Sequence, residues 1–152
     1  MSIEEVLQRT DLFKGLDNFE LSNVANVCQE KSYKQGELIF SEGSTGDELY
    51  VIRSGRVALQ KAGRGFEPAI VVHVAEPGQV FGELALVDRE SRAAGAKAIT
   101  DCEILVLPRE NLHRVFEMSH RTGYTVMHNV AAMLSSRLRK TNLQLLASES
   151  WR

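Results

Sequence analysis

The sequence predicts a mainly β domain with helices at both ends, and three observations lead to this prediction. Apolar residues recur at helical spacing over residues 2–29 and again over residues 108–147. Between these parts, residues 31–107 consist of short β-rich segments separated by glycines. Many short strands with frequent turns are typical of an antiparallel sandwich or barrel. A length of 152 residues fits one domain over residues 1–152.

The N-terminal part, residues 2–29, is predicted to form helices. Four apolar residues at spacings of three and four share one helical face: Leu21, Val24, Ala25 and Cys28. Asp17 and Asn18, with Glu20 soon after, are suited to cap the second of these helices. The first five residues are acidic and amphipathic, which is not the pattern of a signal peptide.

The central part, residues 31–107, is predicted to be the β-barrel. Its apolar segments fall at residues 38–40, 49–52, 57–59, 70–72 and 104–106. The glycines that punctuate them are Gly36, Gly43, Gly46, Gly55, Gly63, Gly65 and Gly78. Residues 61–68 are expected to form an exposed hairpin loop.

The C-terminal part, residues 108–147, is predicted to contain a short helix and a long one. Pro108 is suited to the first turn of the short helix, over residues 108–117. The long helix, from about residue 122 to 147, carries an apolar seam at alternating spacings of three and four: Tyr124, Met127, Ala131, Leu134, Leu138, Thr141 and Leu145. A second stripe of Val126, Val130 and Met133 faces elsewhere and is expected to pack on the barrel.

The two stripes on the long helix favour a homodimer. One barrel covers one face of a helix, so the seam needs a second partner. The alternative is that both stripes belong to the core of a single chain.

Composition argues against several classes of protein. A formal net charge of −2 gives no drive toward nucleic acid or an anionic membrane, and no apolar run is long enough to span a bilayer. Cys28 and Cys102 lack paired spacing, which predicts reduced thiols in a cytoplasmic protein. The four histidines are scattered and no catalytic motif is present. We therefore expect no catalytic residues, no metal site, no cofactor, no nucleic acid partner and no membrane partner.

The strongest functional signal is the segment of residues 81–86 together with an arginine at position 92. Gly82 and Glu83 precede a short apolar helix, and Arg92 follows Glu83 by nine residues. Backbone N–H groups at such a turn attract an anion, and a guanidinium fork can grip two phosphate oxygens. An ionised carboxylate only accepts hydrogen bonds, which suits a sugar hydroxyl. The pattern predicts a ligand with a sugar and one anionic phosphate.

Several motifs in order make residues 36–98 resemble a cyclic nucleotide-binding domain, the module of catabolite activator protein, protein kinase A regulatory subunits and gated channels. They are the glycine motifs at residues 36–40, 42–43, 46–52 and 54–57, and the phosphate-binding cassette at residues 78–98. The resemblance implies an eight-stranded antiparallel jelly-roll barrel with N-terminal helices and a long C-terminal helix. It also implies cAMP, or cGMP, as the ligand.

The resemblance also implies roles for individual residues. Glu83 would bind the ribose 2′-hydroxyl and Arg92 the cyclic phosphate. Four further residues would offer backbone N–H groups or a close approach to the ligand: Gly82, Leu84, Ala85 and Ala93. Since cGMP-selective relatives often have a hydroxyl at the position of Ala93, the alanine favours cAMP. Ser91 and Gly95 depart from the usual proline and β-branched residue without removing a ligand contact.

The base of the nucleotide would be covered from the C-terminal helix. Thr141 and Asn142 lie about where activator-like relatives place the polar residues that reach adenine. The alternative for Thr141 is a hydrogen bond to its own helix backbone. Trp151 is a second candidate for a lid, or a frayed terminal residue.

These expectations describe a stand-alone cytoplasmic cyclic nucleotide sensor that acts on an unknown downstream protein. Ligand binding would move the cassette, the hinge over residues 108–122 and the long helix. The alternatives are a dimeric scaffold with a non-functional pocket and a fragment of a larger cyclic-nucleotide-regulated protein.

Overall fold

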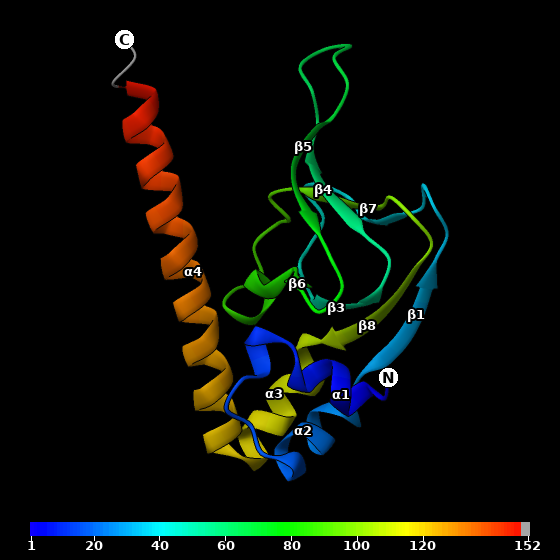
Figure 1. The fold of residues 1–152 in the computed structure, drawn as a ribbon, viewed down its shortest axis with the longest axis vertical. Helices are drawn as coiled ribbons and strands as arrows, with labels where there is room; N and C mark the ends of the chain where they lie inside the picture. Colours follow the sequence, from blue (N-terminus) through cyan, green and yellow to red (C-terminus); the bar gives the residue numbers. More distant parts are fainter. Residues whose placement is uncertain (150–152) are drawn as a thin grey trace.

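Eight strands and six helical segments follow one another in the computed structural model, which describes residues 1–149 (Figure 1). The helical segments are α1 (Ile3–Gln8), η1 (Asp11–Phe13), α2 (Asn18–Ala25), η2 (Glu83–Leu86), α3 (Arg109–Met118) and α4 (His120–Glu149). The strands are β1 (Gln29–Tyr33), β2 (Leu38–Phe40), β3 (Glu48–Ser54), β4 (Val57–Lys61), β5 (Ile70–Ala75), β6 (Val80–Phe81), β7 (Gly95–Ala98) and β8 (Cys102–Pro108).

The strands form two four-stranded antiparallel sheets. One sheet has the order β1-β8-β3-β6 and the other the order β2-β7-β4-β5, so consecutive strands lie in different sheets except β4 and β5, which form a hairpin. This arrangement confirms the predicted jelly-roll fold with flanking helices. The loop between β4 and β5 is exposed, as predicted for the hairpin at residues 61–68.

The sheet that contains β8 separates two apolar cores. Side chains alternate along a strand, so neighbouring residues of β8 face opposite sides. Ile104 and Val106 belong to the core between the sheets, whereas Leu105 and Leu107 belong to the core under the helices. All four are at most 1% exposed. The helices are therefore fixed to the outer face of this sheet, next to the cassette.

The N-terminal helices hold the first turns of α4. Asp17 and Glu20 form a reciprocal capping box at α2, which confirms the predicted cap. The buried Glu20 carboxylate also pairs with Arg121 and accepts a hydrogen bond from Thr122 Oγ1 at 3.1 Å. Burial raises the pKa of Glu20, but the hydrogen bonds from Asp17, Arg121 and Thr122 outweigh it and lower the pKa below its usual value.

A second contact fixes α4 about two turns further on. The Asn129 amide donates hydrogen bonds to the carbonyls of Leu12 and Lys14, at 2.8 and 2.9 Å. Together with Glu20, this contact joins the root of α4 to the N-terminal helices.

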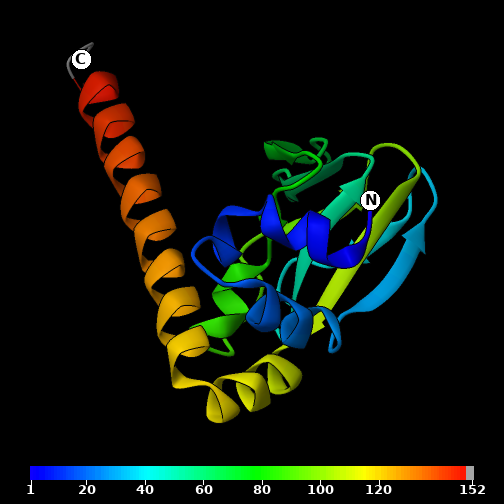
Figure 2. The same cartoon turned by 60° about the horizontal axis from the view of Figure 1, so that its bottom comes forward.

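The C-terminal helices match the prediction except at their junctions. Pro108 ends β8 and caps α3 instead of lying in its first turn, because strand pairing with Glu48 continues to Pro108. The predicted second stripe packs in the core, where Val126 and Val130 are 0% and 1% exposed and Met133 is partly buried. Beyond this region α4 extends away from the barrel (Figures 1 and 2).

Both cysteines are free, and neither has the properties of a nucleophile. Cys102 is buried. Burial, followed by the charges of Glu4 and Glu30, raises the pKa of Cys28 to about 12. Within the described residues, no helix has the length and apolar character needed to cross a bilayer.

Candidate functional site

Gly82 makes the turn that begins the cassette. Its φ of +76° lies in the left-handed region, which residues other than glycine rarely adopt. A Cβ atom there would also stand 2.8 Å from Arg92 Nη1 and 3.2 Å from the Glu48 carbonyl oxygen. The position therefore requires glycine for both its conformation and its space, and it brings the cassette backbone against Arg92.

Arg92 is held in place inside the cassette. Its side chain is 9% exposed, and it donates hydrogen bonds to the carbonyls of Glu48 at 2.7 Å and Gly82 at 3.3 Å. Its guanidinium carbon lies 4.3 Å from the centre of the Phe40 ring, a cation–π distance. Within residues 1–149, its buried Nε has no hydrogen-bond partner. The guanidinium is thus oriented in advance, with donor capacity left for an anion.

An aromatic wall supports the guanidinium. Tyr50 and Phe81 stack with ring centres 4.9 Å apart. The Phe40 ring contacts both in a tilted arrangement, with ring centres 5.5 and 6.0 Å away. Burial, together with the charge of Glu48, raises the pKa of Tyr50 to about 12. The phenol therefore stays neutral at physiological pH and does not repel a phosphate.

Glu83 is buried and faces the long helix. Its side chain is 4% exposed, and its Oε1 lies 2.6 Å from Nη2 of Arg137, whose side chain is 56% exposed. The contact is an ion pair without hydrogen-bond alignment, so the buried carboxylate keeps the capacity to accept hydrogen bonds. Arg137 thus connects the cassette to α4.

Two residues of the site were missed in the sequence. Arg137 could have been suspected because it lies one turn before Thr141 on the same helix face. Gly46 belongs to one of the glycine motifs, and a Cβ atom there would lie 3.3 Å from the Arg92 guanidinium. Its missing side chain leaves room for Arg92.

The remaining predicted residues are only partly brought together. Ala85 is buried, and its N–H already donates to the Gly82 carbonyl at 3.1 Å, so it is not a free donor in this structure. Leu84 and Ala93 lie exposed in the cassette segment.

The structure does not bring the candidates for the adenine contact to the cassette. Thr141 and Asn142 are exposed on α4. The Thr141 hydroxyl donates to the Arg137 carbonyl at 3.0 Å, which is the backbone alternative. Trp151 lies outside the described residues.

A double-mutant cycle should measure the link between Glu83 and Arg137. We expect Arg137→Gln to lower the free energy of unfolding by about 1 kcal/mol, since one partner is largely solvated. In a Glu83→Gln background the same substitution should have little effect, because the carboxylate charge is gone. Urea unfolding of the four proteins gives the coupling. Equal effects of Arg137→Gln in both backgrounds would show that the ion pair has no energetic role.

The geometry agrees with the comparisons to known proteins. The family model "Cyclic nucleotide-binding domain" matches residues 30–119. The chain is 35% identical to the "Cyclic AMP receptor protein" of Thermus thermophilus over 139 residues, which cover 91% of this chain. It spans 62% of that relative's length.

The fold is also similar to those of solved structures. The catabolite activator protein of Thermus thermophilus superposes with a TM-score of 0.79 at 36% identity, covering 90% of this chain and 62% of its own. The regulatory domain of Toxoplasma gondii protein kinase A, crystallised with cAMP, has a TM-score of 0.69 at 32% identity and covers 75% of this chain and 43% of its own. With a family model that matches 30–119 and a cassette built around Gly82, Glu83 and Arg92, this chain belongs to the cyclic nucleotide-binding domain family.

Proposed function

We propose that this chain binds cAMP as a non-catalytic regulatory domain. The observation that carries the proposal is the pair of buried, oppositely charged side chains in the cassette. Arg92 is 9% and Glu83 3% exposed, and Arg92 retains an unpartnered Nε. Burying such groups is costly unless they have partners, so a ligand with a phosphate and a hydroxyl fits the site.

The proposed roles follow from the chemistry of each group. Arg92 binds the cyclic phosphate through its fork, and Glu83 accepts a hydrogen bond from the ribose 2′-hydroxyl. Gly82 lets the backbone approach the ligand. Leu84, Ala85 and Ala93 line the approach, and the absence of a hydroxyl at Ala93 favours cAMP over cGMP. Thr141 and Asn142 reach the base only if α4 moves closer to the cassette.

Arg137 provides a physical route from the ligand to α4. A ribose hydroxyl at Glu83 changes the surroundings of the carboxylate with which Arg137 pairs. Nucleotide binding therefore biases the position of α4, which is a population shift between two arrangements.

We further propose that α4 forms a homodimer with a second copy. Leu138 and Leu145 of the predicted seam are 61% and 58% exposed in the single chain, and Tyr124 at the root of α4 is 74% exposed. Met127 and Leu134, by contrast, pack partly on the chain's own core. The seam is thus divided: two of its residues serve the core, and the exposed ones are left for a partner. The free cysteines fit a reducing, cytoplasmic location.

Melting temperatures measured with cAMP, cGMP and linear 5′-AMP test the proposed function. At about 100 times its dissociation constant, a ligand adds roughly 2.7 kcal/mol of stability. With all three ligands at one equal concentration, we expect cAMP to give the largest shift, cGMP a smaller one and 5′-AMP the smallest. A larger shift with cGMP would overturn the argument from Ala93. No shift with any of the three would favour the scaffold with a non-functional pocket.

A further inference from the structure

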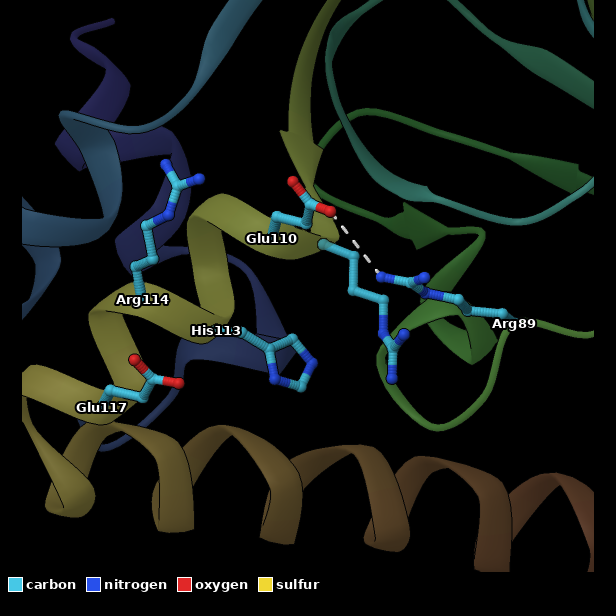
Figure 3. A pocket seen from close by; sticks show the side chains of 6 residues that line it. Arg89, Glu110, His113, Arg114 and Glu117 are labelled. Carbon is cyan, nitrogen blue, oxygen red and sulfur yellow. Dashed lines mark ion pairs between the residues drawn. The ribbon is translucent and has the colours of Figure 1, made fainter.

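A second basic site lies between the cassette loop and α3. A hollow of about 390 Å³ is lined by Arg89, Arg109, Glu110, His113, Arg114 and Glu117 (Figure 3). Neither Arg92 nor Glu83 lines it, so it is separate from the nucleotide site. Arg89 comes from the loop between η2 and β7, and the other residues come from α3.

The ion pair in this hollow is weak. Three guanidinium groups and two carboxylates line the hollow, and Arg89 and Glu110 form the ion pair. The ion pair between Arg89 and Glu110 has an N–O distance of 3.8 Å, and the two side chains are 57% and 72% exposed. A contact of this length is not a hydrogen bond, and an exposed pair is weak. Arg89 is therefore available to another anion.

Two buried nitrogen atoms in the hollow lack partners. Within the described residues, Arg109 Nε and His113 Nε2 have no hydrogen-bond partner although both atoms are buried. Buried polar atoms are paired in most native structures, and an unpaired one destabilises the fold. Arg109 Nε always carries a hydrogen, and His113 Nε2 is a donor in the tautomer that places the proton on it. Both atoms can therefore donate to an acceptor bound in this hollow.

The elements that carry these groups are fixed. The backbone N–H of Arg109 donates to the Asp47 carbonyl at 2.8 Å, which anchors the start of α3. In Figure 3, Arg89 projects from the loop toward Glu110, and His113 lies on the next turn of α3. Arg114 points away from these side chains, so we assign it no role in the site.

We propose that this hollow binds a small phosphate-bearing anion through Arg89, Arg109 and His113. The donors come from two separate elements and from different turns of α3. A tetrahedral phosphate presents oxygens in several directions, whereas a planar carboxylate presents only two. Guanidinium groups bind such oxygens with charge-assisted hydrogen bonds.

Titration with inorganic phosphate, followed by ¹H–¹⁵N NMR, tests the site. Saturating cAMP blocks the nucleotide cassette, and sodium chloride keeps the ionic strength constant. We expect saturable shifts of the Arg89 and Arg109 Nε–H signals and of backbone amides in α3. Arg89→Gln and Arg109→Gln should each weaken phosphate binding about tenfold, which corresponds to about 1.4 kcal/mol.

The matched control is Arg64→Gln, which removes the same charge from the exposed hairpin loop. It should change phosphate affinity less than twofold. Shifts that follow ionic strength alone, or equal weakening by Arg64→Gln, would overturn the proposal. So would phosphate shifts confined to residues 82–86 and 92–93 of the nucleotide site. If Arg109→Gln disturbs folding, the exposed Arg89→Gln still decides the outcome. If cAMP does not bind, the melting temperatures measured with nucleotides show this. The phosphate titration is then carried out without cAMP.

Discussion

Arg92→Ala is expected to reduce cAMP affinity by about 3–5 kcal/mol, or roughly 10²- to 10⁴-fold. The substitution removes the phosphate's positive partner from a buried site. It also frees the carbonyls of Glu48 and Gly82, to which the guanidinium donates. Two acceptors would then face the phosphate, which adds repulsion to the loss of attraction. Isothermal titration calorimetry measures the change directly.

Arg92→Lys is the matched control for charge. A lysine keeps the positive charge but loses the planar fork and the stacking on Phe40. We therefore expect little recovery of affinity. Near-wild-type affinity in both variants would place the phosphate elsewhere, and recovery by lysine alone would mean that charge matters and the fork does not.

Lysine at both Leu138 and Leu145 is expected to convert the proposed dimer to a monomer. These leucines are 61% and 58% exposed in one chain, so the substitutions leave the chain's own core intact. Burying one leucine contributes about 1.5–3 kcal/mol. Four leucines lost per dimer therefore cost about 6 kcal/mol or more, before the cost of burying lysine charges. Sedimentation velocity reports the mass.

The choice of positions follows from the structure. Leu134 also belongs to the predicted seam, but it packs partly on the core, so its substitution would destabilise the fold as well. Leu143→Lys makes the same exchange at an exposed position on the side of α4 opposite Leu138 and Leu145, and it should leave the dimer unchanged. A wild-type chain that sediments as a monomer, or a double variant that remains dimeric, would show that the seam is not an interface.

The cassette could be predicted from the sequence because its determinants are local. Gly82, Glu83 and Arg92 lie within one short segment, and the left-handed turn at Gly82 favours glycine through its own backbone conformation. The capping box at Asp17 and Glu20 is local in the same way. Arg137 was missed because its contact with Glu83 depends on how α4 packs beside the barrel, which no local pattern specifies.

Gly95 is a second residue whose role depends on packing that the sequence does not show. From the sequence, a glycine in this strand only weakens β preference. In the structure, a Cβ atom there would stand 3.3 Å from the Glu42 nitrogen and 3.4 Å from the Phe40 carbonyl. The close approach of β2 to β7 therefore explains the glycine. The pairing of strands that lie far apart in the chain sets this requirement.

The uneven attachment of α4 makes it a lever. Its root is held by Glu20 and Asn129, while its C-terminal end stands clear of the barrel (Figure 2). Between these two parts, Arg137 pairs with Glu83 of the cassette. A small rotation of α4 about its root, caused by a change at Arg137, therefore produces a larger displacement at its C-terminal end. Amide hydrogen exchange should therefore be slowest around Val126 and Val130 and fastest beyond Leu138, and nucleotide should flatten that gradient.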